Sequence, residues 1–282
     1  MKIGTLSLVV GTAACNAACG YCVSKMTGHA AERLDVNWRR FDVACRLAQQ
    51  CGVTTTLLTG KGEPTLWPDL ILDYLQRLDR YRMPVVELQT NGTLLEAGQH
   101  DVRKWASIGL SLVCLSITHY DARSSNQLMQ IRDERFDYWE IVKLLHNLGL
   151  SVRLNCTMLR NGIWQFDQIE RLIDQCRDHG VEQLTLRDVV VPNRCVNKTV
   201  TEYARNQRVS AAAYVRGCLE MQGAVQLLHL PHGAIVYDYH GQNVCVNNCL
   251  TTSTDPDTMR QIIFFPDGRI AYDWTYPGAR LL

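Results

Sequence analysis

The chain has 282 residues, of which 46% are hydrophobic, and its formal net charge is +1. A chain of this length and composition can bury a large core, as a single barrel with an appendage does. Because the charge is near neutral and forms no long blocks of one sign, we expect neither a nucleic acid nor a membrane surface as a partner.

The chain has 12 cysteines, which in a short secreted protein would suggest disulfides, but this chain is long. The chain starts without a signal-peptide pattern, and the apolar run over residues 6–10 is far too short to span a bilayer. We therefore predict a cytoplasmic protein with reduced thiols. Four cysteines lie inside predicted strands or helices, where we expect them to act as small hydrophobic side chains: Cys45, Cys114, Cys156 and Cys176.

Along the first two thirds of the chain, apolar β-branched runs alternate with amphipathic helical patterns. Strands are predicted over residues 5–10, 53–58, 85–89, 110–117, 152–159 and 183–187, and helices over 38–50, 68–80, 98–107, 136–148 and 166–179. Such alternation requires a parallel sheet with right-handed crossovers. Six strands are too few for a closed eight-stranded barrel, which leaves an open doubly wound sheet or a partial barrel.

The last four of these strands carry polar residues on one face and apolar residues on the other. The polar positions are Glu87, Gln89, Asn91, Ser116, Thr118, Arg153, Asn155, Thr157, Thr185 and Arg187. A sheet covered by helices on both faces should be apolar on both, so one polar face predicts a wet or ligand-filled cavity inside a curved sheet. The alternative is that these groups pair with one another in an ordinary core.

The alternation stops after residues 191–193. A helix is predicted over 202–221, strands over 227–230 and 235–239, and a hairpin over 262–272 whose Pro266-Asp267-Gly268 centre is strong turn chemistry. Residues 243–257 have the composition of a loop. We predict two domains, a barrel over 1–195 and an extension over 196–282.

Three cysteines follow the first predicted strand within eight residues: Cys15, Cys19 and Cys22. They lie at the C-terminal end of that strand, where α/β barrels place their active sites. Three thiolates on a four-iron cluster leave one iron open to an outside ligand, whereas electron carriers use four cysteines. The alternative is zinc, which would recruit a fourth ligand such as His29 or a distant cysteine.

Two further turns lie at the C-terminal ends of predicted strands. Residues 59–64, Thr-Gly-Lys-Gly-Glu-Pro, combine flexible glycines with one acidic side chain that could hold a ligand's ammonium group. Residues 89–93, Gln-Thr-Asn-Gly-Thr, end the third strand. Each could also be a plain strand-to-helix turn.

Together these features resemble the radical S-adenosylmethionine (SAM) enzymes. The Cys-x3-Cys-x2-Cys loop, Gly-Glu-Pro after strand two, Thr-Asn-Gly after strand three, a serine on strand four and an asparagine on strand five occur in the family's order, over about residues 5–190. The resemblance implies an α/β fold, a partial (β/α)6 barrel, here with a small C-terminal α+β extension.

The resemblance also implies cofactors and their contacts. A [4Fe-4S] cluster would be held by Cys15, Cys19 and Cys22, and its fourth iron would bind the amino and carboxylate groups of SAM. The adenine would lie near Tyr21, and the methionine amino group near Gly60, Gly62 and Glu63. The ribose or the methionine carboxylate would contact Asn91, Ser116 and Asn155. Lys61 replaces the family's usual glycine; it could approach the methionine carboxylate or point to solvent, and we favour solvent.

The family's chemistry implies the function. One electron cleaves SAM, and the resulting 5′-deoxyadenosyl radical removes hydrogen from a substrate, which we expect to be a polar, anionic or nucleotide-like small molecule. An electron donor such as flavodoxin or ferredoxin would be a partner. Candidate substrate or catalytic residues are Glu87, Gln89, His119, Arg153 and Arg187. Each could instead form salt bridges within the barrel or, for His119, lie in a solvated loop.

The chain is most similar to the branch with the molybdenum-cofactor cyclases and the enzymes with twitch or SPASM extensions. Many of these bind an auxiliary cluster, for which Cys245 and Cys249 are candidates, but no cysteine follows Cys249. We expect a degenerate twitch-like cap without that cluster. The alternatives are a peptide maturase, a glycyl-radical activase and, from another class, a non-catalytic zinc or iron-sulfur binding module.

Overall fold

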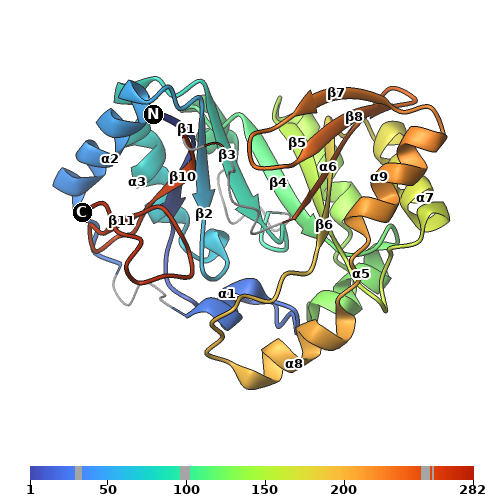
Figure 1. Cartoon of the computed structure of the whole chain (residues 1–282). Coiled ribbons are helices and arrows are strands. Elements are labelled where there is room, and N and C mark those ends of the chain that lie inside the picture. The colour runs from blue at the N-terminus through green and yellow to red at the C-terminus, as the bar shows by residue number, and fades with distance from the viewer. Residues whose placement is uncertain (29–33, 96–101, 249–254, 256) are drawn as a thin grey trace.

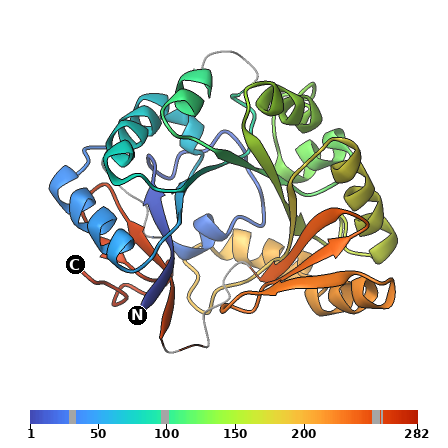
Figure 2. The same ribbon diagram turned by 90° about the horizontal axis from the view of Figure 1, so that it is seen from above.

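The computed structural model describes residues 1–28, 34–95, 102–248, 255 and 257–282. Its strands form one sheet in the order β11-β10-β1-β2-β3-β4-β5-β6-β9-β8-β7. The sheet curves around a central space, with most helices on its outer side (Figure 1, Figure 2). This arrangement confirms the predicted α/β fold with a partial barrel.

The six predicted barrel strands are present as a parallel series. They are β1 (Lys2–Val9), β2 (Thr55–Thr59), β3 (Val85–Thr90), β4 (Leu112–Ile117), β5 (Ser151–Met158) and β6 (Gln183–Asp188). Each of the pairs from β1–β2 to β5–β6 is parallel. All C-terminal strand ends therefore meet at one end of the barrel, where Figure 1 shows α1 (Val23–Thr27) and α8 (Lys198–Gln207).

Helices follow the barrel strands on the outside. The predicted ones are α2 (Trp38–Gln50), α3 (Pro68–Leu78), α6 (Tyr138–Asn147) and α7 (Phe166–Asp178), and α4 is described over Val102–Ser107, with residues 98–101 outside the described range. The short α1 and α5 (Ala122–Met129), together with the 3-10 turns η1 (Pro64–Leu66) and η2 (Asp79–Tyr81), were not predicted. α5 is short and polar, so it lacks a clear apolar stripe, although Asp121 caps its start by accepting from Ser124 N–H.

The last third of the chain corrects two predictions. The helix expected over 202–221 is two helices, α8 and α9 (Ala212–Met221), because the Asp188 carboxylate accepts hydrogen bonds from the N–H groups of Ala211 and Ala212 and starts a new helix there. The loop expected over 243–257 is wrong for its first part, since β9 (Gln242–Asn248) pairs in parallel with β6. Polar side chains on β9 hid the strand pattern.

The other C-terminal strands extend the barrel sheet at both edges. β10 (Thr258–Phe264) pairs in parallel with β1 and forms the predicted hairpin with β11 (Ile270–Ala271), while β7 (Val225–His229) and β8 (Ile235–Tyr239) continue the sheet beyond β9. The division of the chain near residue 195 into two domains stays a prediction. Both parts contribute strands to a single sheet.

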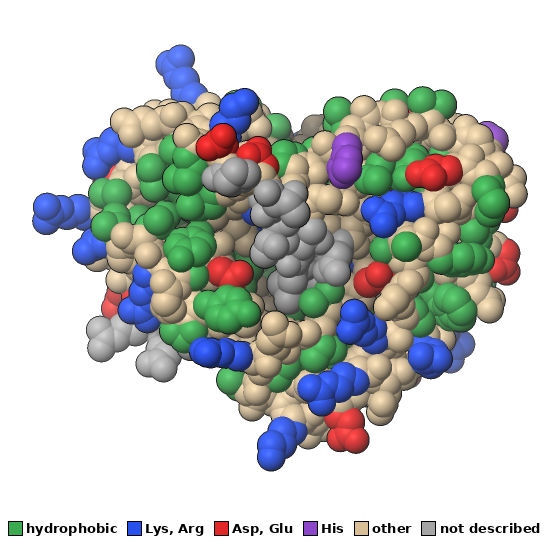
Figure 3. Space-filling model, in the orientation of Figure 1, with side chains coloured by type: hydrophobic (Ala, Val, Ile, Leu, Met, Phe, Trp, Pro, Cys, Tyr) green, Lys and Arg blue, Asp and Glu red, His purple; other side chains and the backbone are tan. Residues whose placement is uncertain are grey.

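One large apolar core lies between the sheet and the outer helices. It includes Phe264 of β10, whose ring packs edge-on against Phe41 of α2 and Tyr74 of α3, with centroids 5.7 and 6.4 Å away. The C-terminal strand is therefore part of the barrel core. On the face in Figure 3, Lys and Arg side chains are scattered among Asp and Glu. Within the described ranges, no helix is long and apolar enough to cross a membrane.

Because Phe264 is fully buried in this core, we expect Phe264→Ala to lower the free energy of unfolding by about 3–5 kcal/mol in urea titrations. The matched control is Leu227→Ala on edge strand β7, where the side chain is 50% exposed and the change should stay within about 0.5 kcal/mol. If Phe264→Ala were as mild as the control, β10 would not belong to the barrel core.

Candidate functional site

A cavity of about 280 Å³ opens at the C-terminal ends of the barrel strands. It gathers residues from the loop after β1, the turns after β2 and β3, and the ends of β4, β5 and β6. Every residue predicted to bind the cluster or SAM lines it: Cys15, Cys19, Tyr21, Cys22, Gly60, Gly62, Glu63, Asn91, Ser116 and Asn155. Of the substrate candidates, Gln89 and Arg187 line it too, and Glu87, His119 and Arg153 do not.

The cysteine loop is fastened by backbone contacts with the end of α5. The Ala18 N–H donates to the Met129 carbonyl at 3.2 Å, and Ala17 forms a β-bridge with Ile131. The Cys19 thiol donates to the same Met129 oxygen at 3.4 Å. Backbone carbonyls carry no residue-type signal, so sequence patterns could not have indicated this support.

The three thiols surround the cavity. Cys15 is exposed and the other two are half-buried. Burial raises the pKa of Cys19 to about 12 and raises that of Cys15 as well. Metal ligation deprotonates a thiol, so binding of a metal centre by these cysteines would release protons. In the part of the chain that the structure describes, no three Cys, His, Asp or Glu side chains could hold one metal ion.

Gly62 allows the turn after β2 to approach the cysteine loop. A Cβ atom at this position would lie 1.9 Å from the carbonyl oxygen of Ala14. The next N–H along the chain, that of Glu63, donates to the same oxygen at 2.9 Å. Only glycine fits at this contact, which sets the distance between the two halves of the cavity wall.

Glu63 is buried, and both oxygens of its carboxylate accept hydrogen bonds from neighbouring residues. One oxygen accepts from the N–H and hydroxyl of Thr65 and from the Thr90 hydroxyl, and the other accepts from the Asn91 N–H at 2.9 Å. Burial raises the pKa of this carboxyl. Glu63 thus ties the turn after β2 to the turn after β3.

Asn91 also has an ordering role that its motif does not reveal. Its side-chain amide donates to the Asn16 side-chain oxygen at 2.8 Å, and its own oxygen accepts from the N–H and hydroxyl of Thr93. The Asn16 amide in turn donates to the Thr93 hydroxyl at 2.7 Å. Sequence analysis missed Asn16 and Thr93; their place inside the two motifs was the available signal.

Lys61 corrects an expectation. We favoured a solvent-facing side chain, but only 6% of Lys61 is exposed. Its ammonium donates to the Thr27 hydroxyl at 2.7 Å and lies 5.4 Å from the ring centroid of Trp274. Burial lowers its pKa to about 8. The side chain turns inward because Thr27 on α1 and Trp274 near the C-terminus lie over the turn.

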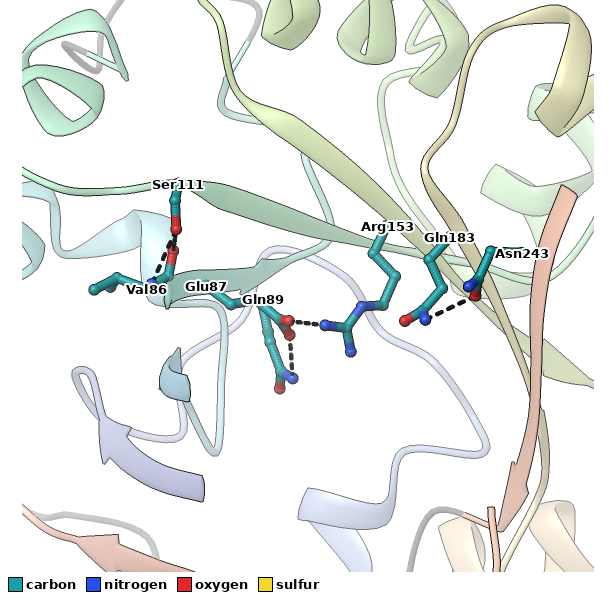
Figure 4. Close-up of polar contacts among 7 residues, drawn as sticks. All are labelled: Val86, Glu87, Gln89, Ser111, Arg153, Gln183 and Asn243. Atoms are coloured by element: carbon teal, nitrogen blue, oxygen red, sulfur yellow. Dashed lines mark hydrogen bonds and ion pairs between the residues drawn. The ribbon is translucent and has the colours of Figure 1, made fainter. Parts of the chain in front are cut away.

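Glu87 and Arg153 form an ion pair with each other inside the barrel (Figure 4). Glu87 is fully buried, and its second oxygen accepts from the Gln89 amide at 2.9 Å. Gln183 on β6 donates to Asn243 on β9 at 2.9 Å. These contacts correspond to the internal pairing that the sequence left open as an alternative, and they form a polar floor below the cavity.

Above this floor the polar face is only partly paired. Strand register aligns Ser116, Asn155 and Thr185 in one row, and Thr157 with Arg187 in the next. Buried atoms without a hydrogen-bond partner among the described residues include Asn155 Oδ1, Thr185 Oγ1 and Arg187 Nε. Buried polar groups are normally paired, so these atoms are candidates for hydrogen bonds to a ligand.

His119 lies apart from the cavity. Its Nδ1 accepts from the Asp121 N–H at 2.9 Å, and its ring contacts the Tyr120 ring at a tilt of 43°, with centroids 4.3 Å apart. Cys249 and His29, named as possible extra metal ligands, lie outside the described residues. Cys245 is buried on β9.

The sequence model of the radical SAM superfamily matches residues 9–173. A curated relative, a probable GTP 3′,8-cyclase from Methanothermobacter thermautotrophicus, is 27% identical over 197 residues, which cover 68% of this chain and 60% of that protein.

Solved structures with the same fold include SuiB from Streptococcus suis bound to its precursor peptide SuiA, with 15% identity and a TM-score of 0.65 over 99% of this chain and 61% of that one. SuiB bound to S-adenosylmethionine has 17% identity and a TM-score of 0.63, covering 98% and 61%. Coproporphyrinogen III oxidase (HemN) from Escherichia coli has 11% identity and a TM-score of 0.53, covering 79% and 53%. The chain thus spans about three fifths of the length of the first relatives in each comparison.

We expect Gly62→Ala to push the cysteine loop away from the turn after β2. It should cost about 1–3 kcal/mol of stability and lower the iron content after cluster reconstitution. Gly217→Ala in α9 is the control, because its Cβ would meet no atom within 4 Å and helix propensity should add about 0.5–1 kcal/mol. Equal iron contents in the two variants would contradict the close-approach argument.

Arg153→Met should leave the Glu87 carboxylate buried without its cation and cost about 3–5 kcal/mol in urea unfolding. The double variant Glu87→Gln/Arg153→Met should lose less than the single one, because no charge remains buried. The exposed pair Arg177–Asp174 serves as the control, with about 0.5 kcal/mol or less expected for Arg177→Met. A single variant no worse than the double would show that the pair is not structural.

Proposed function

The chain belongs to the radical SAM superfamily, and from this we propose that Cys15, Cys19 and Cys22 hold its [4Fe-4S] cluster and that its substrate is a polar, anionic small molecule. As a radical SAM enzyme, it uses that cluster together with SAM. The observation that carries the assignment of the ligands is the single cavity lined by all three thiols and by the turns after β2 and β3.

When bound, the cluster and SAM supply a one-electron cleavage of the sulfonium that yields a radical able to take a hydrogen atom from a substrate. The chain's own residues bind and orient. Gly60 and Gly62 leave backbone groups open at the cavity wall, and Glu63 keeps their turn in place. The Asn155 oxygen, buried without a partner among the described residues, supports a hydrogen bond to the cofactor.

The other contacts follow from the cavity lining. Tyr21 offers an aromatic wall and Ser116 a hydroxyl. Met129, Val189 and Val190 add apolar surface that limits water near the reacting atoms. His119 lies outside this lining, so we do not retain it as a catalytic candidate. Glu87 and Arg153 form an ion pair in the polar floor of the barrel, so we assign them a structural role.

For the substrate we favour an anionic small molecule because Arg187 lines the cofactor cavity. A nucleotide-like substrate is the narrower form of this proposal, and the nucleotide in the name of the probable GTP 3′,8-cyclase relative agrees with it. We also propose a cytoplasmic location with flavodoxin or ferredoxin as electron donor. The free thiols among the described cysteines support a reducing compartment.

The experiment is anaerobic reconstitution with iron and sulfide, followed by SAM and a strong reductant. We expect about four iron atoms per chain, a broad visible absorption and release of 5′-deoxyadenosine. Cys19→Ser should lose the cluster and reduce release at least about tenfold, since the cluster then lacks one of its three thiolate ligands. Cys51→Ser, a half-buried thiol outside the cavity, is the control.

Two results would contradict the proposal. A colourless protein that retains zinc would favour the non-catalytic binding module. An intact cluster that releases no 5′-deoxyadenosine under reducing conditions would remove the proposed reaction while leaving the metal site.

A further inference from the structure

A second cavity, of about 180 Å³, lies beside the cofactor cavity. The two share Gly60, Gln89 and Arg187 in their walls. On its other side it shares Arg260, Gln261 and Trp274 with an outer cavity of about 610 Å³. The second cavity therefore lies between the cofactor cavity and the outer cavity, and we call it the passage.

The charged residues that line this passage are all basic. They are Lys61, Arg187 and Arg260, and its described lining contains no Asp or Glu. The Gln89 and Gln261 amides add neutral groups that can donate hydrogen bonds, and the Ser7 hydroxyl donates to the Gln261 side-chain oxygen at 3.3 Å. A small cavity with this lining is complementary to an anion.

Lys61 has no carboxylate partner in an ion pair with any described residue. Only 6% of Lys61 is exposed, and its ammonium donates a hydrogen bond to the neutral Thr27 hydroxyl. The groups of opposite charge that act on Lys61 are the Cys22 thiol in its ionised form and, more weakly, the Asp273 carboxylate. One Asp273 oxygen accepts from the N–H groups of Thr275 and Tyr276, and Asp273 does not line the passage.

Arg187 also has no carboxylate partner among the described residues. Its Nε is buried and has no hydrogen-bond partner among the residues that the structure describes. The adjacent Asp188 faces the start of α9, where it accepts from Ala211 and Ala212. Glu87, deeper in the barrel, is paired with Arg153. Neither acid neutralises the guanidinium.

A buried cation is normally paired, because removing an unpaired charge from water is costly. We propose that the missing counterion of Lys61 and Arg187 is the substrate, and that these two side chains bind its carboxylate or phosphate group in this passage. The inference rests on the proposed radical SAM function and names the part of the substrate that the chain recognises. An anion held here directs the neighbouring atoms of the substrate toward the cofactor cavity through the shared wall.

The methionine carboxylate of SAM is the competing anion. The Lys61 side chain lines the passage and not the cofactor cavity, and it is held between Thr27 and Trp274. Arg187 lines both cavities and could contact either anion. Lys61 therefore distinguishes the substrate's anion from the cofactor's.

The test uses the reconstituted holoenzyme saturated with SAM, with inorganic pyrophosphate and succinate as probes in calorimetric titrations. We expect at least one probe to bind once per chain, and Lys61→Met and Arg187→Gln each to weaken it by about tenfold or more, as loss of a charged hydrogen-bond donor should. Arg269→Gln is the matched control. Arg269 acts on Lys61 through its charge but is ion-paired with Asp267 and does not line the passage, so we expect a change below about threefold.

The outcomes separate the alternatives. Preference for pyrophosphate assigns a phosphorylated substrate, and preference for succinate a carboxylate. If neither probe binds, if the Lys61 and Arg187 variants bind like the control, or if the probes compete with SAM, the inference is wrong. Wild-type crystals soaked with the bound probe locate it even if a variant does not fold. Release of 5′-deoxyadenosine is a separate readout, so the inference and the proposed function can fail independently.

Discussion

The structure depends on one close approach of two backbones. Gly62 lies so near Ala14 that a side chain has no room, and the Glu63 N–H bonds to the same carbonyl. This contact joins the cysteine loop to the turn after β2. Through its carboxylate, Glu63 then joins that turn to the turn after β3. Three loops that are far apart in sequence are thereby held as one wall, which preorganised binding requires.

The sequence was enough to predict the parts of this wall that depend on residue type and period. Strand patterns located all six barrel strands, and the cysteine spacing located the loop. The orientation of Lys61 could not be predicted, because it depends on Thr27 and on Trp274, more than two hundred positions apart in the chain. Likewise, the break between α8 and α9 comes from Asp188 on a neighbouring strand, a tertiary contact that overrides a continuous helical pattern.

The polar face of the barrel shows why alternation alone could not separate structural from functional residues. Glu87, Gln89, Arg153 and Arg187 follow the same rule of pointing inward. They differ in their position along the strand. Near the strand starts, Glu87 pairs with Arg153 and Gln183 with Asn243, although Arg153 Nε has no partner among the described residues. Nearer the strand ends, Asn155 Oδ1, Thr185 Oγ1 and Arg187 Nε are buried without a described partner. Alternation of side chains with a period of two residues does not show how far along the barrel a residue lies. The register between neighbouring strands does.

The cofactor and the substrate that we propose would be bound by different regions of the sequence. The lining of the cofactor cavity ends at Val190. The passage additionally needs Arg260, Gln261 and Trp274, which β10 and the segment after β11 bring back beside β1. The C-terminal third is thus more than a cover, because its parallel pairing with β1 supplies part of the passage wall. A chain can in this way keep one cofactor site and change its substrate by altering residues beyond the superfamily match at 9–173.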